Sequence, residues 1–149
     1  EYLFYKSDAN YAAGFEIFNV KKRDYKMRLG TLDYENTIGA INFYYRNYKT
    51  IPFDAKISYG EYLAGDVGAS VELSRVFDNG VMFGVFASST NVSAEQFGEG
   101  SFDKGIFFNI PIFGNLVSYS WRPLTKDPGQ KLIRKHTLYD LLVKFKPIN

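Results

Sequence analysis

The side chains most able to do chemistry gather in one stretch, NVSAEQFGEGSFDKGIFF, which spans residues 91–108. It contains the carboxylates of Glu95, Glu99 and Asp103, and a pair of carboxylates is what a glycosidase uses for catalysis. The alternative, which we favour, is that these acids solvate a loop and pair with Lys104 or a neighbouring wall. The stretch is not a dinucleotide motif, because Asp103 stands where the third glycine would be and no strand–turn–helix pattern surrounds it.

A third interpretation of this stretch is a constriction or rim that contacts sugars. Gln96, Phe97 and Glu99 would supply polar and aromatic groups, a combination that suits carbohydrate recognition, and the glycines would let the backbone bend. Leaving Phe97 or Phe102 in solvent would forgo roughly 1.5–3 kcal/mol of apolar burial for each. We therefore expect residues 91–103 to be ordered and folded against the inner wall or across the mouth of a barrel.

Two arginines are the first candidate partners for the loop acids. Arg122 follows a short β-type run, and Arg75 lies in an apparent strand three residues after Glu72. Glu72 and Arg75 are also candidates for an ion pair that faces a polar lumen. The complete set of candidate polysaccharide-contact or lumen residues is Glu95, Gln96, Phe97, Glu99, Asp103, Arg75 and Arg122.

The chain contains one histidine, His136, and no cysteine. A zinc site built from His and Cys ligands and a catalytic thiolate are therefore both excluded. A triad of His136 with Asp140 and a serine is conceivable, but a lone histidine near a strand start is more often structural. We predict no catalytic residue, no metal site and no cofactor.

The formal charge of +2 is too small to indicate nucleic-acid binding. The charge is unevenly distributed, since residues 122–146 carry seven Lys or Arg side chains and two Asp. This segment is either an ordinary charged loop or a contact for lipopolysaccharide phosphates or an acidic polymer. The residues themselves leave both interpretations open.

Hydrophobicity alternates with a period of two along most of the chain, which is typical of strands with one apolar and one wet face. No convincing helical stripe is present, and no run of 18 apolar residues could form a transmembrane helix. The pattern predicts strands at 1–6, 14–22, 37–46, 54–62, 67–77, 81–90, 104–112, 116–122 and 137–146. We expect an all-β antiparallel meander in which each strand pairs with its neighbours in the chain.

The connections between these strands mostly alternate between long and short. Residues 23–36, 91–103 and 123–136 are long connections, whereas Asn79-Gly80 suits a two-residue turn. Alternating loop lengths and an aromatic content of 18% are typical of an outer-membrane β-barrel. A soluble β-sandwich shows the same periodicity, so periodicity alone does not decide between the two.

Several segments resemble one protein family, the YjbH family of bacterial exopolysaccharide and capsule biosynthesis proteins. They are GEYLAGDVGASVELSRVFDNGV at 60–81, TNVSAEQFGEGSFDKGIFFNIP at 90–111, WRPLTKDPGQKL at 121–132, LYDL at 138–141 and, more loosely, KKRDYKMRLGTLDYE at 21–35. The resemblance covers most of the chain. It implies that residues 1–149 are the C-terminal β-barrel segment of a longer protein, often a lipoprotein, in the bacterial outer membrane.

The resemblance also implies a function, which is a non-catalytic part in the export or assembly of an exopolysaccharide or capsule polymer. The expected partners are that polymer, outer-membrane lipid and lipopolysaccharide, and periplasmic export components. A polysaccharide-modifying enzyme that uses the loop carboxylates and a plugged structural barrel are the alternatives. Because the chain opens inside an apparent strand with no signal peptide, we expect that it is a piece of a longer protein.

In a barrel, the apolar strand faces should point outward to lipid and the polar faces inward. A cation on the lipid face would cost about 2–4 kcal/mol at the bilayer centre. The faces expected outside are Ala55/Ile57/Tyr59, Ala69/Val71/Leu73 and Tyr139/Leu141/Val143/Phe145. The faces expected inside carry Lys56, Glu72, Ser74, Asp140 and Lys144.

Overall fold

The computed structural model of the chain describes residues 1–26, 30–47, 49, 51–93, 102–113, 117–123 and 137–145. Within them eight antiparallel strands form one sheet, and each strand pairs with its neighbours in the chain. The strands are β1 (Tyr2–Tyr5), β2 (Tyr11–Arg23), β3 (Thr31–Asn47), β4 (Phe53–Glu61), β5 (Val67–Val76), β6 (Met82–Thr90), β7 (Asp103–Pro111) and β8 (Ser118–Trp121). The predicted all-β antiparallel meander is confirmed.

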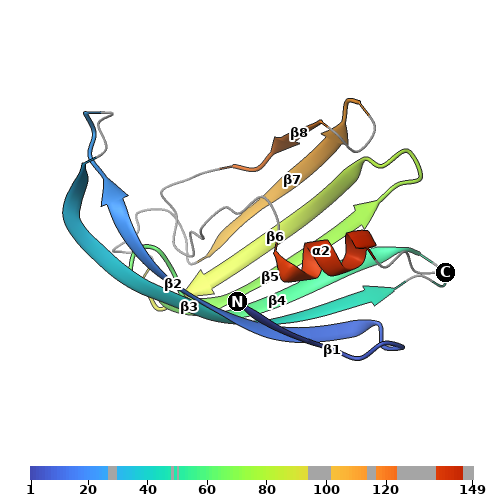
Figure 1. Cartoon of the computed structure of the whole chain (residues 1–149), viewed down its shortest axis with the longest axis horizontal. Helices are drawn as coiled ribbons and strands as arrows, with labels where there is room; N and C mark the ends of the chain where they lie inside the picture. The colour runs from blue at the N-terminus through green and yellow to red at the C-terminus, as the bar shows by residue number, and fades with distance from the viewer. Residues whose placement is uncertain are drawn as a thin grey trace.

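The sheet is curved into a trough and does not close on itself (Figure 1). The four-residue strands β1 and β8 form its two edges. The helix α2 (Leu138–Phe145) lies on the concave side (Figure 1). An open trough of this kind is consistent with part of a barrel, because a closed barrel has no free edges.

The two tightest hairpins have the same turn, in which a glycine at the third loop position adopts a left-handed conformation. Gly80, with φ of 79°, donates its N–H to the Phe77 carbonyl, and Gly65, with φ of 80°, donates to the Tyr62 carbonyl. Each connection therefore has three residues and ends in a glycine bulge, a common hairpin type. The two-residue turn expected at Asn79-Gly80 is one residue too short, because Asp78 also belongs to the loop.

Close approach of the strands depends on glycines in β4 and β5. Gly60 and Gly68 stand opposite one another, and a Cβ on Gly60 would lie 2.6 Å from the Cα of Ala40 in β3. A Cβ on Gly68 would likewise lie 2.5 Å from the Cα of Thr90 in β6. Because backbone atoms cannot move aside as a flexible side chain can, only glycine permits this curvature.

The hairpin of β2 and β3 is longer than the hydrophobic alternation along the chain predicts. Residues 23–36 were expected to be a connection, yet Val20 to Arg23 pair with Asn36 to Thr31, with an irregularity between Lys21 and Arg23. Lys21 and Glu35 form an exposed cross-strand ion pair of 2.9 Å. The extension was missed because the run Lys21, Lys22 and Arg23 interrupts the alternation on the β2 side.

The strand expected at 137–146 is wrong, because the described part of that segment is the helix α2. Thr137 caps it: the Asp140 N–H donates to Thr137 Oγ1 at 3.1 Å, and the Thr137 N–H donates to Asp140 Oδ2 at 2.8 Å. This reciprocal arrangement is a capping box with Asp in place of Glu. Tyr139, Leu142 and Val143, at helical spacing, are less exposed than the residues between them. The outward face proposed for this segment therefore does not exist.

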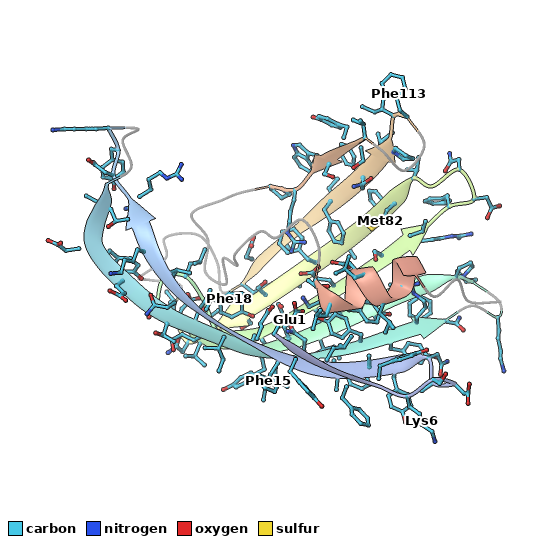
Figure 2. The ribbon with its side chains drawn as sticks, viewed as in Figure 1. Glu1, Lys6, Phe15, Phe18, Met82 and Phe113 are labelled. Atoms are coloured by element: carbon cyan, nitrogen blue, oxygen red, sulfur yellow. The ribbon has the colours of Figure 1, made fainter. Side chains whose placement is uncertain are left out.

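On the sheet itself the predicted division of faces is confirmed. Ile57, Tyr59, Val71 and Leu73 lie on the convex side and are exposed, with 49% of Ile57 accessible. Figure 2 shows Phe15 on this convex side, with Phe18 and Met82 on the opposite, concave side. The exposed apolar residues on the convex face of the described strands include Tyr2, Phe4, Tyr11, Phe15, Ile17, Ile41, Phe43, Tyr45, Ile57, Tyr59, Val71, Leu73, Phe83, Val85, Ile106, Ile110 and Tyr119.

Candidate functional site

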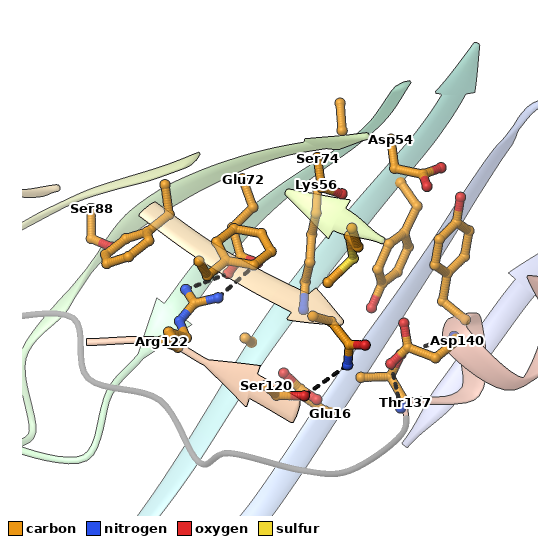
Figure 3. A pocket seen from close by; sticks show the side chains of 18 of the residues that line it. Glu16, Asp54, Lys56, Glu72, Ser74, Ser88, Ser120, Arg122, Thr137 and Asp140 are labelled. Carbon is orange, nitrogen blue, oxygen red and sulfur yellow. Dashed lines mark hydrogen bonds and ion pairs between the residues drawn. The ribbon is translucent and has the colours of Figure 1, made fainter. Parts of the chain in front are cut away.

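The concave side of the sheet holds a groove of about 630 Å³. Its walls come from strands β2 to β8 and from the start of α2 (Figure 3). Cavities of 300–1,000 Å³ are the usual size of small-ligand sites. Within the lining, aromatic side chains such as Tyr44, Phe86 and Phe107 alternate with charged ones such as Lys56, Glu72 and Arg122.

A row of buried polar residues crosses the concave face from β3 to β7. Successive members stand directly opposite one another in the strand register, so that the row runs perpendicular to the strands. Its members are Asn42, Ser58, Ser70, Ser88 and Asp103, with 2%, 2%, 3%, 6% and 9% of their surface accessible. The Ser58 hydroxyl and the Asn42 side-chain oxygen are 2.6 Å apart, in hydrogen-bonding contact. The side of the sheet that is shielded is therefore polar at its centre.

Arg122 forms the best-defined contact across the groove. Its guanidinium, which follows the end of β8, donates to both carboxylate oxygens of Glu72 on β5, at 3.0 and 3.3 Å (Figure 3). The same guanidinium lies 4.4 Å from the ring centroid of Phe86 and 4.9 Å from that of Phe107. Bidentate pairing and aromatic stacking are the contacts for which arginine is suited. They connect the end of the sheet to its middle.

The two rings beneath Arg122 rest on glycines of the neighbouring strands. Phe107 stands opposite Gly84, and Phe86 stands opposite Gly105. A Cβ at either glycine would collide with the facing ring, at 2.7 Å from Phe107 Cε1 and 2.8 Å from Phe86 Cε1. The glycines thus provide the space that lets both rings lie flat and support the guanidinium.

A second ion pair and an aromatic stack hold α2 against the sheet. Arg46 on β3 pairs with Asp54 on β4, with 2.7 Å between Arg46 Nη2 and Asp54 Oδ2. Beside them the rings of Tyr44 and Tyr139 stack at 4.1 Å and 10°, and Arg46 lies 5.8 Å from the Tyr139 ring centroid. Burial raises the pKa of the Tyr139 phenol to about 12, although the Arg46 charge acts in the opposite direction.

Lys56 lies between these two ion pairs and points into the groove (Figure 3). Its ammonium nitrogen is 5.4 Å from the ring centroid of Tyr44, its neighbour across the β3–β4 ladder. On the other side it stands opposite Glu72, whose carboxylate binds Arg122. The ion pairs of the described residues do not include Lys56.

The structure brings together only some of the residues proposed from the sequence. Arg122 and Asp103 line the groove, but Arg122 pairs with Glu72 and not with Asp103. Arg75 lies at 5.0 Å from the Phe77 ring centroid, on the same exposed face of β5 as Val71 and Leu73. The expected pair of Glu72 with Arg75 is therefore wrong, because residues three apart on a strand point to opposite faces.

The remaining loop candidates fall outside the described residues. They are Glu95, Gln96, Phe97 and Glu99. At the described end of the loop, Phe102 is exposed, with Lys104 Nζ 4.9 Å from its ring centroid, and Asp103 is buried at the start of β7. The expectation that Phe102 would fold against an inner wall is therefore wrong. The expectations for Phe97 and for the order of the whole loop stay predictions.

Sequence reasoning did not select Lys56, Tyr44 or Tyr139 as site residues. Alternation assigned Lys56 to the inner face. Whether its ammonium forms an ion pair there depends on which basic residue binds the Glu72 carboxylate, and the sequence does not show this. Tyr44 meets Tyr139 only because a helix folds back onto β3, and the signal for that helix was the Thr137-x-x-Asp140 cap. Within the described residues, no group of three or more His, Cys, Asp or Glu side chains could hold a metal ion.

None of the helical residues that the structure describes forms a segment long and apolar enough to cross a membrane. A family model described as "Exopolysaccharide biosynthesis protein YbjH", of the YjbH family, matches residues 1–144. Among curated proteins, the chain is similar to the "Uncharacterized lipoprotein YjbH" of Escherichia coli (strain K12), at 36% identity over 151 residues. The match covers 95% of this chain but only 22% of that relative. No solved structure matches the chain.

Proposed function

The chain belongs to the YjbH family of exopolysaccharide biosynthesis proteins, and on that premise we propose that it forms part of an outer-membrane β-barrel. In this proposal the convex face contacts lipid and the concave face lines a polar path. The protein takes part in exporting or assembling an exopolysaccharide or capsule polymer and performs no catalysis on it. Its partners are the polymer, the lipid and lipopolysaccharide of the outer membrane, and periplasmic export components.

One observation carries the membrane part of the proposal, namely the inverted polarity of the sheet. A water-soluble sheet packs its apolar face into a core and exposes its polar face. Here the shielded row is Asn42, Ser58, Ser70, Ser88 and Asp103, whereas Ile57, Tyr59, Val71 and Leu73 are exposed. Lipid is the solvent in which such an arrangement is favourable, and an antiparallel sheet satisfies its own backbone groups there.

The aromatic residues of the convex face give further support. Tyr11 stacks on Phe43 with ring centroids 6.4 Å apart, and Tyr2 stacks on Phe15 at 5.6 Å. Transmembrane barrels carry such girdles where lipid headgroups meet the hydrocarbon. The name of the Escherichia coli relative, a lipoprotein, is also in keeping with a place in the cell envelope.

The polymer part of the proposal is supported by the groove and by the family. The groove combines aromatic rings with hydroxyl, amide and charged groups, which together can contact the apolar and polar faces of a sugar. In the described residues the carboxylates of Asp54 and Glu72 are both bound to arginines. Because both carboxylates already accept hydrogen bonds from arginines, they act as structural groups. This favours a path for the polymer over a site that hydrolyses it.

The position of α2 favours one variant of this function, a barrel whose interior is partly blocked. The helix lies on the concave side and is attached by the Tyr44–Tyr139 stack and by the hydrogen bond from the Leu138 N–H to Glu1 Oε1 at 3.1 Å. A barrel of this kind would be plugged at rest. Removing residues 137–149 from the full-length protein should then increase uptake of a large hydrophilic dye, whereas an open path would show no increase.

The test of the proposed function uses a bacterium that lacks the full-length gene and is complemented with variants. Wild-type protein should fractionate with the outer membrane and restore secreted polymer. The variants Glu95→Gln and Glu99→Gln should restore it equally well, since no catalytic carboxylate is involved. Recovery in the inner membrane or the soluble fraction would contradict the location, and loss of polymer modification in either variant would favour an enzyme.

A further inference from the structure

Lys56 is a cation in the middle of the groove whose nearest carboxylates are already engaged. Its direct neighbour across the ladder is Glu72, which accepts two hydrogen bonds from Arg122. Asp54 lies two residues away on the same strand and accepts a hydrogen bond from Arg46. Arginine binds a carboxylate through two parallel donors and lysine does not, so among the described residues these pairings leave the ammonium of Lys56 outside any ion pair.

The other acidic residues of the groove do not replace these partners. Asp140 accepts hydrogen bonds from Thr137 in the cap of α2. Glu61 lies five residues along β4 from Lys56, roughly 17 Å for an extended strand. Glu16 and Asp103 have interactions of their own, and the ion pairs of the described residues include neither with Lys56.

The surroundings of Lys56 resemble a binding position for a sugar that carries an anionic group. The ring of Tyr44 lies below the ammonium, and the hydroxyl-bearing Ser74 also lines the groove. A hydroxyl can donate to or accept from the polar groups of a sugar, whereas the Tyr44 ring, 3% accessible and stacked on Tyr139, supports the ammonium from below and does not contact the sugar. Because Lys56 faces the concave side, the anion has to come from a ligand in the groove and not from the lipid on the convex face.

We propose that Lys56 binds the carboxylate of an acidic sugar unit as the polymer lies in the groove. This inference rests on the proposed function and narrows it from polysaccharides in general to acidic ones. The ammonium donates a charge-assisted hydrogen bond to the carboxylate, while the Arg46–Asp54 and Arg122–Glu72 pairs hold the walls on either side. A neutral polymer would leave this cation uncompensated and would bind less tightly.

The experiment measures binding of oligogalacturonate to the full-length protein in nanodiscs by isothermal titration calorimetry. A malto-oligosaccharide of the same length is the neutral probe and inorganic phosphate is the simple anion. The wild type should bind oligogalacturonate in preference to both. Lys56→Met should weaken this binding by about tenfold or more, the range expected for a charge-assisted hydrogen bond. Lys56→Arg should retain most of it, and higher salt should weaken the wild type more than Lys56→Met.

Lys6→Met provides the matched control, because Lys6 is an exposed lysine in the turn between β1 and β2. It should bind like the wild type. Thermal unfolding of each variant shows whether the sheet is intact, and Lys56→Arg preserves the test if Lys56→Met fails to assemble. Oligogalacturonate binding that is unchanged in Lys56→Met would overturn the inference and leave the proposed function standing. Preference for the neutral probe, or binding of phosphate alone, would also overturn it, whereas binding of neither sugar would contradict the polymer contact itself.

Discussion

The Arg122–Glu72 pair should contribute measurably to stability, and Glu72→Gln tests this with little change of shape. Two charge-assisted hydrogen bonds of 3.0 and 3.3 Å are lost or weakened. Removing one partner of a fully buried pair costs about 3–5 kcal/mol, whereas exposed pairs are worth about 0.2–1 kcal/mol. With 32% of the Arg122 side chain and 18% of the Glu72 side chain accessible, we expect an intermediate cost of about 1–2 kcal/mol.

A double-mutant cycle isolates this contribution from the aromatic contacts of Arg122. The four proteins are the wild type, Glu72→Gln, Arg122→Met and the double variant, and thermal unfolding is followed by circular dichroism in detergent. Arg122→Met alone should cost more than Glu72→Gln, because it also removes the contacts with Phe86 and Phe107. The coupling energy between the two positions should be about 1–2 kcal/mol.

The matched control is the exposed pair Lys21–Glu35, whose side chains are about half accessible. Glu35→Gln should leave the unfolding midpoint close to that of the wild type, because solvent screens an exposed ion pair. If Glu72 and Arg122 instead behave additively within about 0.3–0.5 kcal/mol, the two side chains do not interact in the folded protein. The view that this pair connects the end of the sheet to its middle would then be refuted.

Three further predictions follow from single positions. Gly68→Val should prevent or strongly reduce assembly, because its Cβ would lie 2.5 Å from the Thr90 Cα. Gly30→Ala should assemble normally, because its Cβ would meet nothing closer than 3.8 Å. Heat-modifiable mobility on gels measures assembly in both. Ile57→Arg on the convex face should lower the yield in the outer membrane by destabilising the protein by about 2–4 kcal/mol, and an undiminished yield would contradict lipid contact there. Because burial raises the pKa of Tyr139 from 10.0 to about 12, its protonated phenol stabilises the fold fully below pH 10, and this contribution is lost as the pH rises through 12. The fall in unfolding midpoint between these pH values should be smaller in Tyr139→Phe, and an identical fall would show that α2 does not bury this phenol.

The strands were predictable because alternation on a two-faced sheet is a local property of the sequence. Ala55 to Tyr59 and Val67 to Leu73 show it without interruption, and the meander follows from short connections between them. The β2–β3 extension was not predicted in this way, since Lys21, Lys22 and Arg23 interrupt the alternation on the β2 side. Helix α2 was misassigned because Tyr139, Leu141 and Val143 also fit a period of two, while the cap at Thr137 was overlooked.

The groove depends on information that alternation does not contain. Alternation placed Lys56 and Glu72 on the inner face, but only the register shows that they stand opposite one another. The proposed pair of Arg75 with Glu72 disregarded alternation, because a spacing of three residues puts the two side chains on opposite faces. The pairing of Arg122 with Glu72 joins residues 50 positions apart, so neither motif nor period could have identified it.

The central claim is that the convex face contacts lipid and the concave face contacts water, and spin-label accessibility tests it most directly. The full-length protein, with no other reactive thiol, would carry a single label in proteoliposomes at Ile57→Cys or Leu73→Cys on the convex face. Lys56→Cys and Ser74→Cys would report on the concave face. The claim predicts higher collision rates with oxygen, which partitions into lipid, at the first two positions, and with a water-soluble nickel complex at the other two. Equal accessibility to the nickel complex at all four positions, or the reverse pattern, would contradict it.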